Sequence, residues 1–92
     1  MANLVAMLAH GSRGGEVLLE EGSHTLNAEF GGIAGVAGLF YRGVPGRRGA
    51  MDVEALREMI RPVTRYHMGT ALLWMENTHN RAGGAVLPLA HM

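Results

Sequence analysis

Residues 71–89 read ALLWMENTHNRAGGAVLPL, and this stretch decides how the rest of the chain is interpreted. It opens with a run of apolar residues, 71–75, and turns polar at once at residues 76–80, ENTHN. A short apolar run without alternation favours a strand buried on both faces, as in a parallel sheet covered by helices. Ligands bind beyond the carboxyl ends of such strands. We therefore expect chemistry at residues 76–80, although asparagine and threonine are also ordinary turn formers.

The composition limits the kind of protein that this chain can form. Its 92 residues suffice for one small domain. The 8 basic residues balance the 8 acidic ones, so the net charge gives no general electrostatic attraction to nucleic acid or anionic membranes. The absence of cysteine excludes disulfides and thiolate metal sites and is what we expect of a cytoplasmic protein. No apolar run approaches the roughly 20 residues that span a bilayer, and we expect no signal peptide.

One feature of the composition bears directly on chemistry. All 8 basic residues are arginine, and the chain contains no lysine. An enzyme that holds its cofactor or substrate as a Schiff base needs a lysine amine. This chain alone cannot supply that amine.

Alternating strand and helix signals predict an α/β fold. Strands are expected at residues 16–20, 38–42 and 71–76, and helices at residues 2–10, 24–30 and 53–61. Ser23 and Asp52 are the expected N-caps of the second and third helices. The glycine-rich run 31–38 is expected to let backbones pack closely, and residues 43–49 to form a polar loop. Strands that alternate with helices imply a parallel sheet with right-handed crossovers.

The histidines offer candidate sites. His24 would begin the second helix, and Glu29 would lie near the end of that helix. His67 precedes the third strand and His79 follows it, so the two would lie at opposite ends of a parallel strand. A metal site of His24, Glu29 and His79 is one alternative, although no pair among them has the i, i+4 spacing of a helical zinc site.

Several motifs, taken in order, resemble one enzyme family. Residues 76–89, ENTHNRAGGAVLPL, closely resemble the segment after a central strand in L-threonine aldolases, which are pyridoxal-phosphate lyases of the aspartate-aminotransferase-like fold. ANLVA at 2–6 resembles the helix after their phosphate-binding turn, and RGGEV at 13–17 resembles their turn into the next strand. HTLNAEFGG at 24–32 is similar to their H-x4-E-x-G-G segment, and residues 52–62 are similar to their next helix. The resemblance covers the whole chain and keeps the motif order.

The resemblance implies roles for particular side chains. His24 would stack on the pyridine ring of pyridoxal phosphate and lie near the substrate hydroxyl, and Glu29 would be a polar neighbour. A second histidine that holds the hydroxyl would be His67, with Tyr66 as the alternative.

The same resemblance implies contacts from two backbone segments. Ala2 and Asn3 would lie where helix amides face the cofactor phosphate. The loop on the substrate side would comprise Asn77, Thr78 and His79.

The implied fold is a partial three-layer α/β structure, with three parallel strands in the order 2-1-3 and helices on both faces. Residues 1–92 would be an internal fragment of the pyridoxal-phosphate-binding large domain, without its Schiff-base lysine, and we expect the chain alone to be inactive. The parent reaction would be retro-aldol cleavage of L-threonine or L-allo-threonine to glycine and acetaldehyde, a step of threonine catabolism and glycine biosynthesis. The complete enzyme would be a cytoplasmic homodimer or homotetramer that acts on a small amino acid, with no nucleic-acid or membrane partner.

Three alternatives remain open. The chain could be a non-catalytic α/β fragment that associates through open sheet edges. It could be the small His/Glu metal module described above. Within the enzyme class, it could belong to a related β-eliminating lyase of the same fold.

Overall fold

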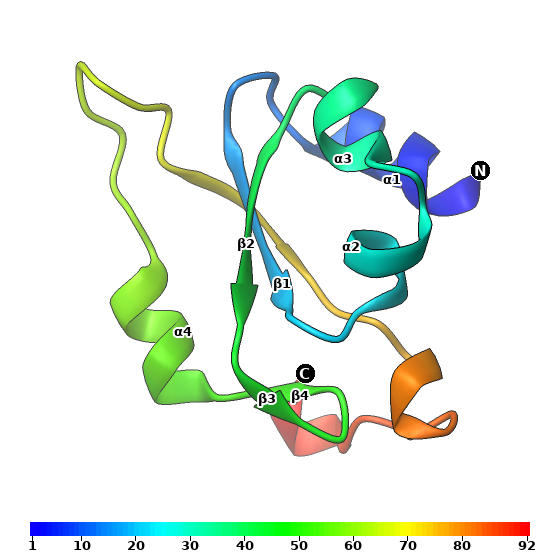
Figure 1. Ribbon diagram of the computed structural model, residues 1–92. Coiled ribbons are helices and arrows are strands. Elements are labelled where there is room, and N and C mark those ends of the chain that lie inside the picture. The colour runs from blue at the N-terminus through cyan, green and yellow to red at the C-terminus, as the bar shows by residue number, and fades with distance from the viewer.

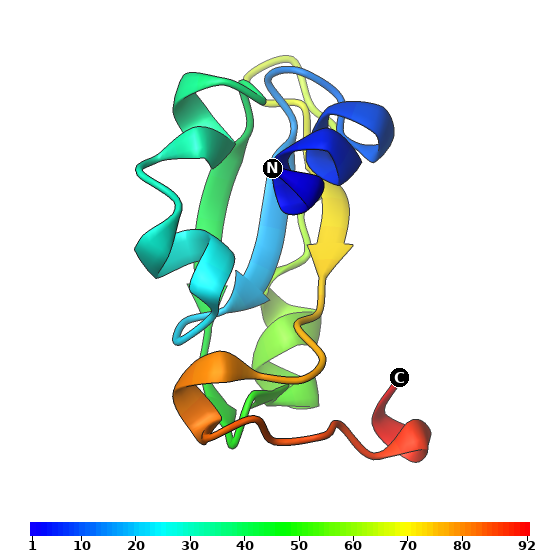
Figure 2. The same cartoon turned by 90° about the vertical axis from the view of Figure 1, so that its right-hand side faces the viewer.

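Three parallel strands form the centre of the computed structural model, which describes residues 1–92. Strand β1 (Glu16–Glu20) lies in the middle, with β2 (Phe40–Val44) on one side and β5 (Thr70–Trp74) on the other. Both pairings are parallel (Figure 1), and Figure 2 shows β1 between β2 and β5. The order β2-β1-β5 is the 2-1-3 order expected for the first, second and third strands of this sheet. The predicted α/β class with three parallel strands is confirmed.

Helices cover both faces of the sheet. Helices α1 (Ala2–His10), α2 (His24–Ala28) and α3 (Gly32–Gly35) lie on one side, and α4 (Val53–Met59) lies on the other (Figure 1). Asp52 caps α4 as expected, because its Oδ1 accepts hydrogen bonds from two backbone amides of the first turn. None of the helices combines the length and the apolar character that a membrane-spanning helix requires.

The central strand β1 is buried along its whole length because both of its faces are packed. Val17 and Leu19 belong to the larger core cluster, on the side of α1 and α3, and Leu18 belongs to the smaller one, on the side of α4. The other buried members of the larger cluster are Met7, Ile33, Ala37 and Leu39. Those of the smaller cluster are Val44 and Met51.

Strand β5 differs from the expectation that residues 71–75 are buried on both faces. Leu72 and Trp74 are partly buried against the larger cluster, whereas Leu73 is 45% exposed and Met75 is 39% exposed. The reason is position: β5 is an edge strand, and α4 packs against β2 on the far side of the sheet. The prediction that residues 71–75 are buried on both faces is therefore wrong, and β1 is the strand of this sheet that is buried throughout.

The connections hold elements that the sequence did not predict. Within the expected loop 43–49 and just after it, β3 (Gly46–Arg47) and β4 (Ala50–Met51) form a small antiparallel hairpin. Its two turn residues, Arg48 and Gly49, both have positive φ, as a type I′ hairpin turn requires. The glycine-rich run contains the short helix α3, and two 3-10 turns, η1 (Asn80–Ala82) and η2 (Leu89–His91), follow β5.

Candidate functional site

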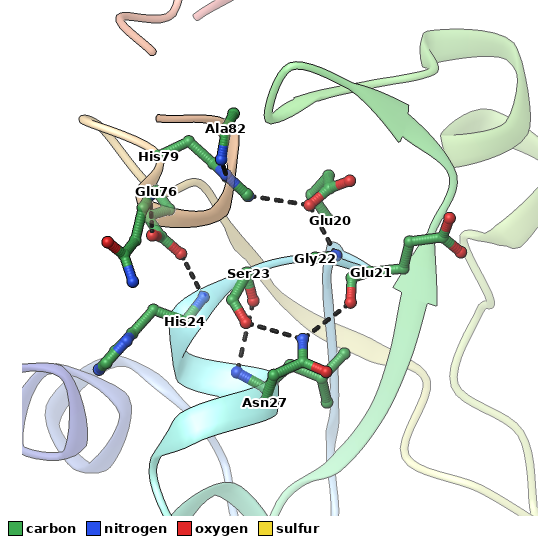
Figure 3. Close-up of polar contacts among 11 residues, drawn as sticks. Glu20, Glu21, Gly22, Ser23, His24, Asn27, Glu76, His79 and Ala82 are labelled. Carbon is green, nitrogen blue, oxygen red and sulfur yellow. Dashed lines mark hydrogen bonds and ion pairs between the residues drawn. The ribbon is translucent and has the colours of Figure 1, made fainter. Parts of the chain in front are cut away.

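The carboxyl ends of β1 and β5 bring two distant segments together, residues 20–24 and residues 76–80 (Figure 3). The carboxylate of Glu76 joins them, since its Oε2 accepts a 2.5 Å hydrogen bond from the backbone amide of His24. The other oxygen of Glu76 accepts a 2.8 Å bond from the amide of Asn80 within its own loop. The loop 76–80 therefore lies beside the start of α2, at the edge of the sheet where ligands are expected.

His24 is the first residue of α2, and its position is fixed from the backbone. Ser23, which is buried, is the N-cap, and its Oγ accepts a bond from the amide of Leu26. The His24 side chain itself is 42% exposed. In Figure 3 its ring points away from Glu76 and from the buried contacts behind it. The imidazole is thus available to a ligand at this edge.

Glu29 connects His24 to the first helix. Its Oε1 accepts a 2.6 Å hydrogen bond from Nδ2 of Asn3 and lies 3.6 Å from Nε2 of His24. Three of the residues singled out from the sequence therefore meet, although Asn3 and Glu29 are 26 positions apart. Ala2 is exposed beside them at the start of α1, where the N-cap Met1 makes no side-chain cap hydrogen bond. The first amides of α1 are thus available to an anion.

The side chain of His79 faces the interior. His79 is 2% exposed, and its Nε2 lies 2.9 Å from Oε2 of Glu20. Of its neighbours in the expected substrate-side loop, Thr78 is exposed, and Asn77 accepts a 3.2 Å bond from the amide of Leu87. The loop lies where the sequence places it, but only part of it faces solvent.

His67 and its alternative Tyr66 lie at the opposite edge of the sheet. Both line a cleft of about 430 Å³ together with Glu16, which begins β1, and with Arg42 and Arg61. The polarity of the strands explains this placement, because a residue before a parallel strand lies at the amino edge and a residue after it lies at the carboxyl edge. The structure does not bring His67 or Tyr66 to His24.

The carboxylate at the amino edge is held by ionic hydrogen bonds. Arg42 donates through Nε to Oε2 of Glu16 at 2.6 Å and through Nη2 to Oε1 at 2.7 Å, and the Thr70 hydroxyl donates to Oε1 at 2.9 Å. The bonds from Arg42 are the main reason that the pKa of Glu16 is lowered, and burial opposes them. The same interaction raises the pKa of Arg42. This pair ties β1 to β2 and has a structural role.

The metal-module alternative finds no support in the geometry. No group of three histidine, cysteine, aspartate or glutamate side chains is arranged to hold a metal ion. His79, one of the three residues of the metal-site alternative, is hydrogen-bonded to Glu20 and does not face His24 and Glu29.

Two glutamates at this edge, Glu20 and Glu76, have partners that the sequence does not reveal. Glu20 was assigned only to a strand, and Glu76 was placed in the right region without a partner. Their partners lie 59 and 52 positions away along the chain, beyond what local patterns reveal. The one available signal was an acidic residue that closes an apolar strand, in EVLLE and in ALLWME.

Comparisons with known proteins give a consistent result. The protein-family model described as "Beta-eliminating lyase" matches residues 1–92. The chain is 33% identical over 96 residues to "Probable low-specificity L-threonine aldolase 2" and 34% identical over 95 residues to "Low-specificity L-threonine aldolase 1", both of Arabidopsis thaliana. It is 33% identical over 92 residues to "Low specificity L-threonine aldolase" of Escherichia coli (strain K12).

These matches cover nearly all of this chain but only part of each relative. They extend over 99–100% of the chain and over 26–27% of the relatives. The chain thus spans about a quarter of the length of the curated relatives that it matches.

Proposed function

This chain belongs to the β-eliminating lyase family, and from that membership we propose that it is part of a pyridoxal-phosphate lyase that cleaves L-threonine and L-allo-threonine to glycine and acetaldehyde. The names of the three relatives above support this reaction. The structural observation that carries the proposal is the exposed imidazole of His24 at the carboxyl edge of a parallel sheet, beside Glu29 and the start of α1.

The residues present fit two parts of the cofactor. The imidazole of His24 is accessible enough to stack on a flat pyridine ring. The uncapped amides of Ala2 and Asn3 fit the phosphate, because a helix start favours an anion and the chain leaves those donors free. No lysine is present, so the amine that anchors the cofactor lies outside these 92 residues.

We assign the following chemistry to the side chains of this chain. When bound, the cofactor supplies the electron sink for the carbanion left on glycine. His24 accepts the proton of the substrate β-hydroxyl, directly or through one water molecule. Glu29, held by Asn3, limits the orientations of the imidazole. Exposed Thr78 lies on the loop that we assign to the substrate side.

A cofactor-binding experiment on the chain itself tests the proposal. Trp74 is the single tryptophan, and it ends β5 next to the loop 76–80, so bound pyridoxal phosphate is expected to quench its fluorescence saturably. The His24→Ala variant should lose most of this quenching. The His10→Ala variant is the matched control, since His10 is exposed at the far end of α1.

Two results would contradict the proposal. One is the absence of saturable quenching from a folded chain. The other is equal quenching in the His24→Ala variant and in the His10→Ala control, which would place the cofactor elsewhere.

A second candidate function is β-elimination, because the matching family model carries that description. Elimination would expel the leaving group from the β-carbon of the amino acid, and addition of one water molecule would then give a keto acid and ammonia. Retro-aldol cleavage releases an aldehyde and glycine. The two reactions are therefore separated by product analysis on an assembly that contains the missing lysine.

A further inference from the structure

His79 and Glu20 form a buried pair in which every polar atom of the imidazole has a partner. Nε2 of His79 lies 2.9 Å from Oε2 of Glu20, and the same oxygen accepts a 2.7 Å bond from the amide of Gly22. Nδ1 of His79 accepts a 3.3 Å bond from the amide of Ala82 (Figure 3). The exposed fractions of the His79 and Glu20 side chains are 3% and 11%.

These contacts define where the proton of the imidazole lies. A backbone amide can only donate, so Nδ1 of His79 must present its lone pair to Ala82. The proton is therefore on Nε2, from which it is donated to the carboxylate of Glu20. Both nitrogens of this histidine are engaged, and neither is free to exchange protons with a substrate.

The ring is also enclosed by the β3–β4 hairpin. A Cβ atom placed on Gly49 would lie 2.4 Å from Cγ of His79, so only glycine fits against the imidazole there. The backbone of His79 is fixed as well, because its amide donates to the carbonyl of Ala85 at 2.8 Å and its carbonyl accepts from Gly84 at 3.0 Å. His79 thus connects the end of β1, the hairpin and the turn that follows β5.

The loop fixed in this way also holds His24. Glu76, three positions before His79, receives the amide of His24 on one oxygen and the amide of Asn80 on the other. We propose that His79, through its pair with Glu20, is a positioning residue that seats the loop 76–80 against α2 and so fixes His24. The importance of His79 for catalysis rests on the function proposed for His24. The effect of His79 on the position of the loop 76–80 does not depend on that function.

Loss of the pair has a defined local consequence. Without the imidazole, the buried carboxylate of Glu20 keeps only its bond from the amide of Gly22, and the amide of Ala82 loses its acceptor, which favours opening of the loop. Glu76 would then no longer be held in place to accept from the amide of His24. That amide should exchange faster with solvent while the centre of β1 stays protected.

Nuclear magnetic resonance on the 92-residue chain tests this connection without cofactor or activity. In the native chain, long-range ¹H–¹⁵N spectra should show His79 with its proton on Nε2. In the His79→Ala variant, the amide of His24 should exchange about tenfold faster or more, whereas the amide of Leu18 should keep its native rate. The His79→Gln variant, whose side chain retains an N–H donor, should recover part of the protection at His24.

A substitution of Glu20, the partner of His79, keeps the test informative if a His79 variant does not fold. Glu20→Met keeps nearly the size of the side chain but removes the acceptor oxygens, so it should also speed exchange at His24; the matched control is Glu21→Met at the exposed neighbouring carboxylate. Unchanged exchange at His24 in folded His79→Ala or Glu20→Met overturns the proposal. If neither variant folds, a proton on Nδ1 of His79 in the native chain overturns it. Failure of the cofactor-quenching experiment affects none of these readouts, so the two proposals fail separately.

Discussion

The side-chain amide of Asn3 and the carboxylate of Glu29 are joined by a 2.6 Å hydrogen bond between α1 and the end of α2. Because each residue is the other's partner, truncating both should cost less than the sum of the single changes. We expect a coupling free energy of about 0.5–1.5 kcal/mol in a double-mutant cycle of Asn3→Ala and Glu29→Ala. Urea unfolding measures it, and the cycle of Asn3→Ala with Glu58→Ala on α4 serves as the additive control. Additivity in the Asn3–Glu29 cycle would show that the bond does not persist in solution.

The pair of Glu16 and Arg42 predicts how stability depends on pH. The pKa of Glu16 is lowered in the folded chain, chiefly by its bonds from Arg42, so its ionised form stabilises the fold above the unfolded pKa of about 4.3. That contribution is lost as the pH falls through the lowered folded value. At pH 7, Glu16→Gln should cost about 1–3 kcal/mol of unfolding free energy. The gap between the native chain and the variant should shrink below a pH of about 4 in urea titrations, and a gap that is constant or widens would contradict the assignment.

Because β1 is more deeply buried than β5, a leucine-to-alanine change should lower the unfolding free energy more in β1 than in β5. Leu18 is fully buried, so Leu18→Ala should lower the unfolding free energy by about 2–5 kcal/mol. Leu73 is 45% exposed on the edge strand, so Leu73→Ala should cost less than about 1 kcal/mol. Urea unfolding of both variants at several protein concentrations measures the difference. A large, concentration-dependent loss for Leu73→Ala would show that another copy covers β5 in solution.

Because His67 lies at the amino edge of the sheet, we expect it to make no contribution to cofactor binding by this chain. Because His67 lies in the cleft beside Glu16 and not beside His24, His67→Ala should leave the quenching of Trp74 by pyridoxal phosphate unchanged. Fluorescence titration of the variant checks this. Weaker quenching would show that residues 62–69 reach the carboxyl edge when the cofactor binds.

Because the chain contains no lysine, we expect the chain alone not to cleave L-threonine. The purified chain with pyridoxal phosphate and L-threonine should release no acetaldehyde, and borohydride should fix no cofactor onto an internal side chain. Acetaldehyde release, measured with an aldehyde-specific reagent, would refute this expectation.

A chimera tests the reaction itself. Residues 1–92 would replace the segment of the Escherichia coli relative to which they align, so that the rest of that protein supplies the remaining parts. The chimera should release acetaldehyde from L-threonine, and its His24→Ala variant should be about 100-fold slower. Release of a keto acid instead would favour the β-eliminating alternative, and cofactor absorbance shows whether each chimera is assembled.

Much of the fold could be predicted because its signals are local. The apolar run VLL within EVLLE, the cap Asp52 and the alternation of strands with helices indicate β1, α4 and the parallel sheet, and the structure agrees. The hairpin was missed because type I′ turns usually show Asn-Gly, whereas Arg48 takes the first left-handed position here. The burial of β5 was misjudged because an apolar run does not show whether neighbours cover both faces.

The candidate site could be predicted only in part, for a related reason. The resemblance to the aldolases implied that His24 and Asn3 contact one cofactor, with Glu29 as a polar neighbour, and the structure shows Glu29 in contact with both. The orientation of His79 could not be predicted, since it depends on Glu20, 59 positions earlier, and on the absence of a side chain at Gly49. Which edge a histidine occupies follows from strand direction, and this separates His67 from His24.

The central strand carries a carboxylate at each end, Glu16 and Glu20, on the same side as Leu18, while Val17 and Leu19 face the opposite core. A misalignment of β1 by one position would turn both charges into hydrocarbon, away from Arg42 and His79. Two hydrogen-bonded carboxylates, one at each end of β1, thus help to set the alignment of the sheet. The chain can therefore distinguish its correct strand pairing from its nearest competitor by electrostatics as well as by packing.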